Sequence, residues 1–167
     1  MFANDNDGQY PSSTVQVVQA WSFFNEVRNE LSTPRVLYCP SDKDRPANGR
    51  SFPTDFTSMQ NGEPATNNFS HWNHRDGSLS YFVGLDANET NVQMILTGDR
   101  NLTMAPLPSG TIWTLGTNST IGWTEKIHNK QGNIGLADGS VQQMTNWKLT
   151  EQLRVTGDAT NRIVMPQ

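Results

Sequence analysis

Residues 133–144, "NIGLADGSVQQM", place an Asp-Gly pair between two short runs in which apolar side chains alternate with polar ones. Asp-Gly in this setting is the strongest short-range signal for a β-hairpin, because both residues tolerate the backbone angles of a tight turn. The stretch therefore predicts two antiparallel strands joined by a two-residue type I′ turn at Asp138 and Gly139, with positive φ at Gly139.

His128 precedes this hairpin and is separated from Asp138 by nine residues. A His and an Asp can form a metal site or half of a catalytic dyad. If the strand between them is extended, however, a rise of roughly 3.3 Å per residue separates the two side chains by about 15 Å, too far to share an ion. We interpret His128, Asp138 and Gly139 as architectural, with His128 bonded to backbone or to a strand neighbour.

The second half of the chain contains more short β-prone runs, separated by Gly, Asn and Pro. They predict an antiparallel meander. The runs are "SLSYFVGL" (78–85), "VQMILTGD" (92–99), "TIWTL" (111–115), "IGWTEKIH" (121–128), "NIGLA" (133–137) and "SVQQM" (140–144).

Two helices are expected at the two sides of this sheet. Ser13 to Leu31 begins with a capping-box spacing and places Trp21 and Phe24 on one apolar face, which should bury both rings against the sheet. Residues 146–155, "NWKLTEQLRV", predict a short C-terminal helix followed by a tail. The fold class is therefore α+β, a single domain over residues 1–167 with an N-terminal helix packed on an antiparallel β-sheet.

Residues 41–76, which we call the excursion, show no sustained periodicity. They predict a long irregular loop within the domain, and a loop of that length often serves as an interaction surface. The excursion is rich in Asn and carries the aromatic residues Phe52, Phe56, Phe69 and Trp72. This composition suits capture of a glycan or a peptide, and it equally suits a loop that buries its own aromatic rings.

Composition excludes several classes of function. The formal net charge is −4 and only 17% of residues are charged, so the basic field that attracts nucleic acid is missing. The single Cys39 cannot form an internal disulfide. The residues given contain neither an apolar run long enough to span a membrane nor a signal peptide.

Cys39 is a candidate nucleophile, with His128 or His71 as its base. No surrounding motif supports this role, and we favour a small buried side chain at the end of a short apolar run. Asp99 and Arg100, in "TGDRN", are expected in an exposed turn with a surface ion pair. Because no acid, base and nucleophile can be assembled from these residues, we do not expect an enzyme.

Two further segments carry weak metal signals. His71, His74 and Asp76 would form a metal cluster if they lay on a helix, but the neighbouring Asn and Gly predict a loop. Asn4 to Gly8, "NDNDG", resembles the start of a calcium loop but lacks its terminal Glu, so a turn is the better interpretation.

Several motifs in order resemble one family over nearly the whole chain. They are "ANDNDGQYP" (3–11), "CPSD" (39–42), "SYFVGL" (80–85), "TGDRN" (97–101) and the H-X9-DG array of His128, Asp138 and Gly139. Together they resemble the prepilin-type, pseudopilin-like proteins with an H-X9-DG processing-associated domain. The resemblance implies a structural subunit of a type II secretion or type IV pilus-like assembly, with other pilin-like subunits as partners and no peptidase mechanism.

The resemblance also implies features that precede and surround this head. In the family, a short basic leader and a methylated hydrophobic helix come first, so we expect that such a helix has been removed here and that it provides the membrane contact. The head would be extracytoplasmic, in the periplasm or at the cell surface, and anchored in the inner membrane before assembly. Some related heads bind calcium in loops near their C-terminal strands. Here the acids in suitable loops are Asp86, Asp99, Asp138 and Asp158, and we keep Asp99 and Asp138 as the calcium candidates.

Overall fold

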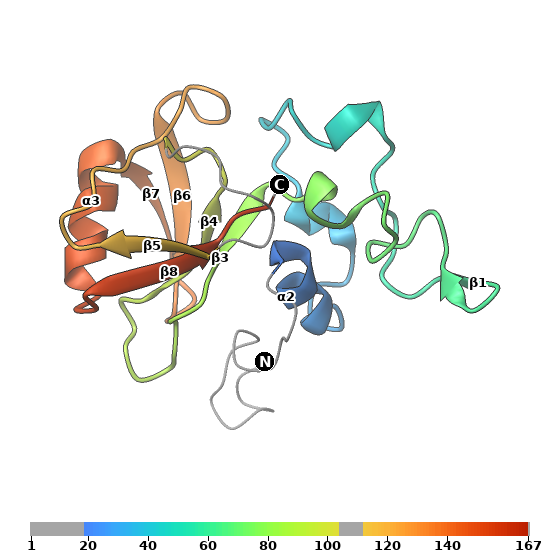
Figure 1. The fold of residues 1–167 in the computed structure, drawn as a ribbon, viewed down its shortest axis with the longest axis horizontal. Coiled ribbons are helices and arrows are strands. Elements are labelled where there is room, and N and C mark those ends of the chain that lie inside the picture. Colours follow the sequence, from blue (N-terminus) through green and yellow to red (C-terminus); the bar gives the residue numbers. More distant parts are fainter. Residues whose placement is uncertain (1–18, 104–111, 167) are drawn as a thin grey trace.

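A six-stranded antiparallel sheet forms one half of the molecule, and an irregular layer lies beside it in the computed structural model, which describes residues 19–103 and 112–166 (Figure 1). The strand order across the sheet is β5-β8-β3-β4-β6-β7, and each neighbouring pair is antiparallel. The strands are β3 (Tyr81–Gly84), β4 (Ile95–Asp99), β5 (Ile112–Gly116), β6 (Gln131–Leu136), β7 (Val141–Thr145) and β8 (Thr160–Val164).

The sheet buries a large apolar cluster on one face together with helix α3 (Asn146–Val155). The Thr145 side chain accepts a hydrogen bond from the Lys148 amide and caps the helix, which orients Leu149 and Leu153 into the cluster. The members of this cluster are Phe82, Ile95, Leu102, Trp113, Leu115, Ile121, Trp123, Ile134, Leu136, Met144, Leu149, Leu153, Ile163 and Met165. The short C-terminal helix predicted from the sequence is confirmed.

The hairpin predicted at residues 133–144 is present as β6 and β7, and Gly139 has a φ of +82°. The turn differs from the predicted type. The Gly139 amide donates to the carbonyl of Leu136, and the Leu136 amide donates to that of Ser140, so three residues form the loop. Asp138 is not among the residues with positive φ. This pattern is a type I turn followed by a left-handed glycine, which is the usual three-residue hairpin loop.

The predicted fold class, in which an N-terminal helix over Ser13 to Leu31 packs on the sheet, is wrong. In the described part of the chain the first helix is α2 (Ala20–Glu26), only seven residues long. Its first turn is held by a distant residue, because the Trp21 amide donates to Asp76 Oδ1 at 2.7 Å. A helix this short depends on such tertiary contacts rather than on its own periodicity. The architecture is thus mainly antiparallel sheet with two short helices among the described residues.

The helical spacing of apolar residues also predicts the wrong buried side chains for this segment. Ala20 and Phe23 are the buried residues of α2, whereas Trp21 and Phe24 are only partly buried at the edge of the same cluster. The Arg75 guanidinium lies 4.8 Å from the Trp21 ring centroid and covers it from the outside. The start of the predicted helix, including Ser13, lies outside the described residues.

Two strand assignments also differ from the prediction. Residues 121–128 form no strand, and only Trp123 makes an isolated bridge, to Leu102. The predicted tail instead supplies β8, which lies between β5 and β3 in the sheet. The alternation of apolar and polar residues that would predict this strand is interrupted by Asn161, a polar residue on the buried side. Its side-chain Nδ2 donates to the carbonyls of Leu115 and Leu153.

The excursion forms the irregular layer seen to the right of the sheet in Figure 1. Its regular elements are very short: η3 (Ala47–Gly49), β1 (Met59–Gln60), β2 (Glu63–Pro64) and η4 (Arg75–Ser78), with η2 (Pro34–Leu37) just before it. Phe56 and Phe69 are buried in a second apolar cluster, whose other buried members are Ala20, Phe23, Leu37, Leu79, Val83 and Val164. The excursion therefore buries two of its own aromatic rings.

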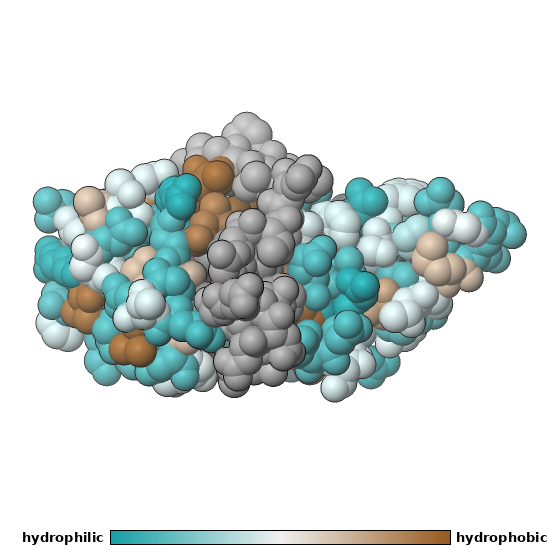
Figure 2. Space-filling view, turned by 90° about the horizontal axis from the view of Figure 1, so that it is seen from below, coloured by the Kyte–Doolittle hydropathy of each residue, from teal (hydrophilic) through white to brown (hydrophobic). Residues whose placement is uncertain are grey.

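The described residues on the face shown in Figure 2 are mostly hydrophilic or of intermediate hydropathy. On the face shown in Figure 2, hydrophobic residues form only small separate patches. Within residues 19–103 and 112–166, no helix is long and apolar enough to cross a lipid bilayer.

Candidate functional site

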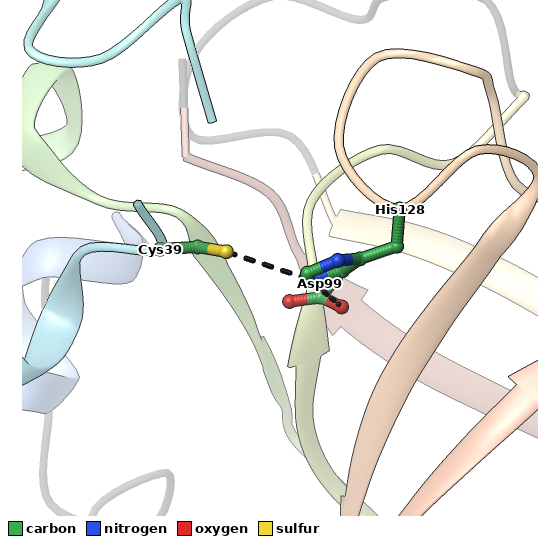
Figure 3. A group of neighbouring side chains, drawn as sticks. All are labelled: Cys39, Asp99 and His128. Atoms are coloured by element: carbon green, nitrogen blue, oxygen red, sulfur yellow. Dashed lines mark hydrogen bonds and ion pairs between the residues drawn. The ribbon is translucent and has the colours of Figure 1, made fainter. Parts of the chain in front are cut away.

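Three chemically reactive side chains from distant parts of the sequence meet where the excursion joins the sheet (Figure 3). Cys39 Sγ lies 3.4 Å from His128 Nε2, and the same nitrogen lies 3.5 Å from Asp99 Oδ2. One donor atom from each residue lies within 4.8 Å of the other two. Cys39 and Asp99 are buried and His128 is partly exposed. We call this group the Cys39 cluster.

Backbone contacts and one ion pair place Cys39 against the sheet. The chain leaves η2 beside the start of β3, where the Ser80 amide donates to the Leu37 carbonyl. A turn follows at once, because the Asp42 amide donates to the carbonyl of Cys39 at 2.8 Å. The Asp42 carboxylate then accepts two hydrogen bonds from the Arg100 guanidinium, at 2.7 and 2.6 Å. A bidentate pair of this kind fixes both position and orientation.

Asp99 is the last residue of β4 and has no exposed surface. Its Oδ2 accepts hydrogen bonds from the Asn133 amide at 2.6 Å and from Asn133 Nδ2 at 3.0 Å. Its Oδ1 is buried and has no hydrogen-bond partner among the described residues. Burial raises the pKa of the Asp99 carboxyl, although the bonds from Asn133 and the proximity of His128 oppose the rise.

The loop that carries His128 is held by Asn101. Asn101 Nδ2 donates to the carbonyls of Thr124 and Gln131, one on each side of the loop, and the Thr124 amide donates to the Asn101 carbonyl at 2.7 Å. Asn129 and Lys130 adopt positive φ and return the chain into β6. His128 is therefore presented by a short clamped loop rather than by a strand.

The surroundings of the cluster carry several charges. Burial and the neighbouring Cys39, Asp99 and Asp42 raise the pKa of Tyr81 to about 12. Arg100 is already engaged by Asp42, and it also lies 3.4 Å from Asp44. Among the described residues, neither a Lys nor an Arg forms an ion pair with Asp99, and the basic group that faces it is Nε2 of His128 at 3.5 Å.

The structure corrects one sequence interpretation of this region and adds a contact to another. Asp99 and Arg100 do not form an exposed turn, since Asp99 is buried and Arg100 pairs with the buried Asp42. His128 contacts Asp99, a residue of the neighbouring strand β4, and in addition the side chain of Cys39. Cys39 is a small buried residue as expected, but it has His128 as a close neighbour.

His128 and Asp138 lie at opposite ends of β6, as the hairpin argument predicts. Asp138 is exposed and its Oδ1 accepts a hydrogen bond from the Ser140 amide at 2.8 Å, a contact with Ser140 that lowers the pKa of this carboxyl. Asp99 also lies at the far end of the sheet from Asp138, because it faces Asn133 at the beginning of β6. The two calcium candidates cannot share one ion.

The remaining metal candidates have other partners. Asp86 Oδ1 accepts hydrogen bonds from Nε and Nη2 of Arg162, and Asp158 accepts a hydrogen bond from the Thr160 amide. In the "HWNHRDG" segment, His74 Nε2 lies 2.8 Å from the carbonyl of Thr66, and Asp76 binds the Trp21 amide. Within the described residues, only the Cys39 cluster brings three metal-binding side chains together. Asn4 to Gly8 lies outside them.

Every segment of this site is recognisable in the sequence, where His128 is a candidate base for Cys39, but Asp99 is not linked to either residue. "CPSD" supplies Cys39 and Asp42, "TGDRN" supplies Asp99 to Asn101, and the H-X9-DG array supplies His128. The spacing directed attention to Asp138, whereas the acid that His128 meets is Asp99, 29 residues earlier in a different strand. No local pattern in a single sequence indicates that pairing.

Comparisons with known proteins add no further assignment, because the chain matches no protein-family model, no curated protein and no solved structure. The pilin-like resemblance therefore rests on the sequence motifs.

The geometry distinguishes a nucleophilic role from a metal-binding role for the Cys39 cluster. A Cys-His-acid nucleophile needs the acid on one ring nitrogen and the thiol on the other, so that the acid orients the base. Here Cys39 Sγ and Asp99 Oδ2 both approach Nε2 of His128. The three donors converge on one point, which is the arrangement of metal ligands rather than of a relay.

Proposed function

We propose that this chain is a structural subunit of a type II secretion or type IV pilus-like assembly, which lies outside the cytoplasmic membrane and acts by packing and surface recognition. The proposal begins from the motif resemblance. The observation that supports it is the position of the motif residues: "CPSD", "SYFVGL", "TGDRN" and His128 all meet at the junction of the excursion and the sheet.

The roles of these residues are those of a scaffold. Asp42 and Arg100 tie the segment after η2 to the end of β4, and Asn101 fixes the His128 loop. Such contacts hold a surface in a constant shape, which a subunit that packs against its neighbours requires.

The open edge of the sheet offers a place for packing. β7 is an edge strand, and Val141 on it is 71% exposed. Trp147, at the start of the following helix, is also 71% exposed. Exposed edges and large apolar side chains are features of surfaces that another chain covers.

In vivo photo-crosslinking tests this function. A photoreactive residue is introduced at Trp147 in cells that produce the full-length protein, and a second strain carries it at Met59, on the distant β1 hairpin. We expect Trp147 adducts that contain other pilin-like subunits, from a fraction that protease added outside the cytoplasm can reach. Adducts made only with unrelated proteins, or a protein confined to the cytoplasm, would contradict the proposal.

A second candidate, an extracytoplasmic glycan- or peptide-binding module, is favoured by a hollow in the excursion. The hollow has a volume of about 400 Å³ and is lined by Arg50, Ser51, Phe52, Thr54, Thr66, Asn67, Asn73 and His74. Trp72 stands nearby and is 67% exposed, with the Arg50 guanidinium 5.5 Å from its ring centroid. An exposed aromatic ring beside polar side chains suits sugar recognition.

Glycan-array binding separates this candidate from the first. A module of this kind would bind a defined set of glycans and lose that binding when Trp72 is replaced by Ala, while Trp147→Ala would retain it. No glycan bound above background would leave the structural subunit as the supported function.

A further inference from the structure

We propose that the Cys39 cluster binds one zinc ion through Cys39 Sγ, His128 Nε2 and an oxygen of Asp99. This inference does not rest on the pilin-like function. It comes from the donor atoms, their separations and an unpaired buried oxygen, all within residues that the structure describes.

The donor set selects the class of metal. A thiolate and an imidazole prefer borderline or soft transition ions, whereas calcium and magnesium take oxygen ligands almost exclusively. Cysteine, histidine and a carboxylate are the three ligand types of protein zinc sites. The cluster thus fits zinc better than the calcium that the family resemblance suggests.

Two of the three separations between donor atoms already match a zinc site, and the third, between Cys39 and Asp99, is within 4.8 Å. Zinc bonds of roughly 2.0–2.3 Å in a tetrahedral arrangement put neighbouring ligand atoms roughly 3.3–3.6 Å apart. Cys39 Sγ and His128 Nε2 are 3.4 Å apart, and His128 Nε2 and Asp99 Oδ2 are 3.5 Å apart. Metal binding would therefore need little movement of the three segments.

An ion would also resolve an electrostatic deficit. Asp99 Oδ1 is buried without a hydrogen-bond partner in the described part of the chain, and burial of an unpaired carboxylate oxygen is costly. Arg100, the next residue, is committed to Asp42. A divalent cation between Asp99 and Cys39 would supply the missing positive charge.

Two of the proposed ligands are held in place by hydrogen bonds of the kind that surround metal sites in proteins. The Asn133 amide and side chain hold Asp99 Oδ2, and the clamped loop holds His128. Hydrogen bonds of this kind orient ligands and raise metal affinity. With three protein ligands, the fourth position is left to water on the side where His128 is exposed. The ion would join the segment after η2, strand β4 and the His128 loop.

Metal titration of the purified chain, stripped with a chelator, tests the proposal. We expect one zinc ion per chain with a Kd of about 1 µM or lower, and a rise in melting temperature on zinc addition but not on calcium addition. Cobalt(II), used as a spectroscopic substitute, should give a thiolate-to-cobalt charge-transfer band and the intense visible bands of a tetrahedral site.

Matched variants locate the ion. Cys39→Ser should remove the charge-transfer band, and His128→Gln should weaken zinc binding about 100-fold or more. His71→Gln, which changes a histidine outside the cluster, should bind zinc as the wild-type chain does. Absence of saturable zinc binding by the folded wild-type chain would overturn the proposal whether or not the variants fold, and so would cobalt binding without a thiolate band.

Discussion

The strands of the sheet bury a larger share of their side chains than the excursion does, and the two regions are held together differently. The sheet encloses a cluster of apolar residues in which Phe82, Ile134 and Leu153 have almost no exposed surface. The excursion contributes two aromatic rings to a smaller cluster, and it also buries the polar residues Asn68 and His74.

The difference follows from where backbone hydrogen bonds are made. In the sheet, neighbouring strands satisfy each other's backbone N–H and C=O groups. The excursion has few paired strands, so side chains take over: Asn68 Nδ2 donates to the Ser58 carbonyl, and Asn68 Oδ1 accepts from the Ser70 amide. A buried polar group that loses its partner is expensive. The sheet should therefore respond mainly to changes of side-chain volume, and the excursion to the loss of individual hydrogen bonds.

The largest expected effect comes from emptying the core of the sheet. Phe82→Ala should lower the free energy of unfolding by about 3 to 5 kcal/mol, because the cavity adds to the lost burial of the ring. Phe82 is 1% exposed. Urea denaturation measures the change, with Trp72→Ala as the control, since that ring is 67% exposed. Equal losses for the two variants would contradict this account of the sheet.

The next effect concerns a buried amide in the excursion. Asn68→Ala should cost about 2 to 3 kcal/mol, because it leaves the Ser58 carbonyl and the Ser70 amide without this partner. Hydrogen–deuterium exchange should become faster in residues 54–74 and stay unchanged in β4 and β6. Asn29→Ala, at an exposed position, is the control. Faster exchange throughout the sheet would show that the two regions are not separable.

A smaller effect is expected at the turn between β6 and β7, where the backbone conformation of Gly139 determines the stability. Gly139→Val should cost about 1 to 3 kcal/mol, because a β-branched residue is strained at a φ of +82°. A Cβ at Gly139 would meet no atom within 4 Å, so the loss would measure conformation and not a clash. Asp138→Ala in the same turn should cost less, and thermal unfolding gives the ranking; the reverse order would contradict the turn geometry.

The smallest effect is a pH dependence confined to the excursion. Burial lowers the pKa of His74 below the ordinary histidine value of 6.5, although its hydrogen bond to the Thr66 carbonyl opposes this. The unfolded chain then takes up a proton at higher pH than the folded chain. The stability that His74 contributes is present above pH 6.5 and is lost as the pH falls from there through the lowered pKa.

Exchange rates in residues 54–74 should accordingly rise as the pH is lowered from 7 to about 5, after correction for the intrinsic pH dependence of exchange. His74→Gln should remove most of this rise, and His71→Gln should leave it intact. A rise of the same size in both variants would assign the acid sensitivity to another group.

The sequence predicted the parts of the fold that local patterns encode. The β6–β7 hairpin and α3 are where alternation and helical spacing predict them, and β3 and β4 lie inside the predicted runs. Local patterns failed where distant residues decide. Helix α2 is fixed by a hydrogen bond to Asp76, 55 residues from Trp21 in the sequence. The sequence pattern predicts a tail at β8, because Asn161 is polar, yet this residue is buried and donates hydrogen bonds to carbonyls of β5 and α3.

The candidate site shows the same limit. Cys39, Asp99 and His128 were each noted in the sequence, but their meeting depends on a strand pairing, an Asp42–Arg100 ion pair and a clamped loop. A buried carboxylate is also the less common outcome for an Asp that ends a strand, so a surface turn was the reasonable prediction for Asp99.

The position of β8 determines the order in which this chain can fold. β8 follows the other five strands of this sheet in the sequence, yet in the sheet it separates β5 from β3, and among the described residues β5 has no other strand partner. While the chain emerges from a ribosome or a translocon, β5 cannot join the other strands of the sheet until residues 160–164 are available to form β8. Closing that gap joins segments far apart in the sequence, a step that is intrinsically slow and exposes unpaired strand edges. A nascent chain of this protein therefore depends on residues 160–164, and a product cut short before Thr160 would present an incomplete sheet to chaperones and proteases.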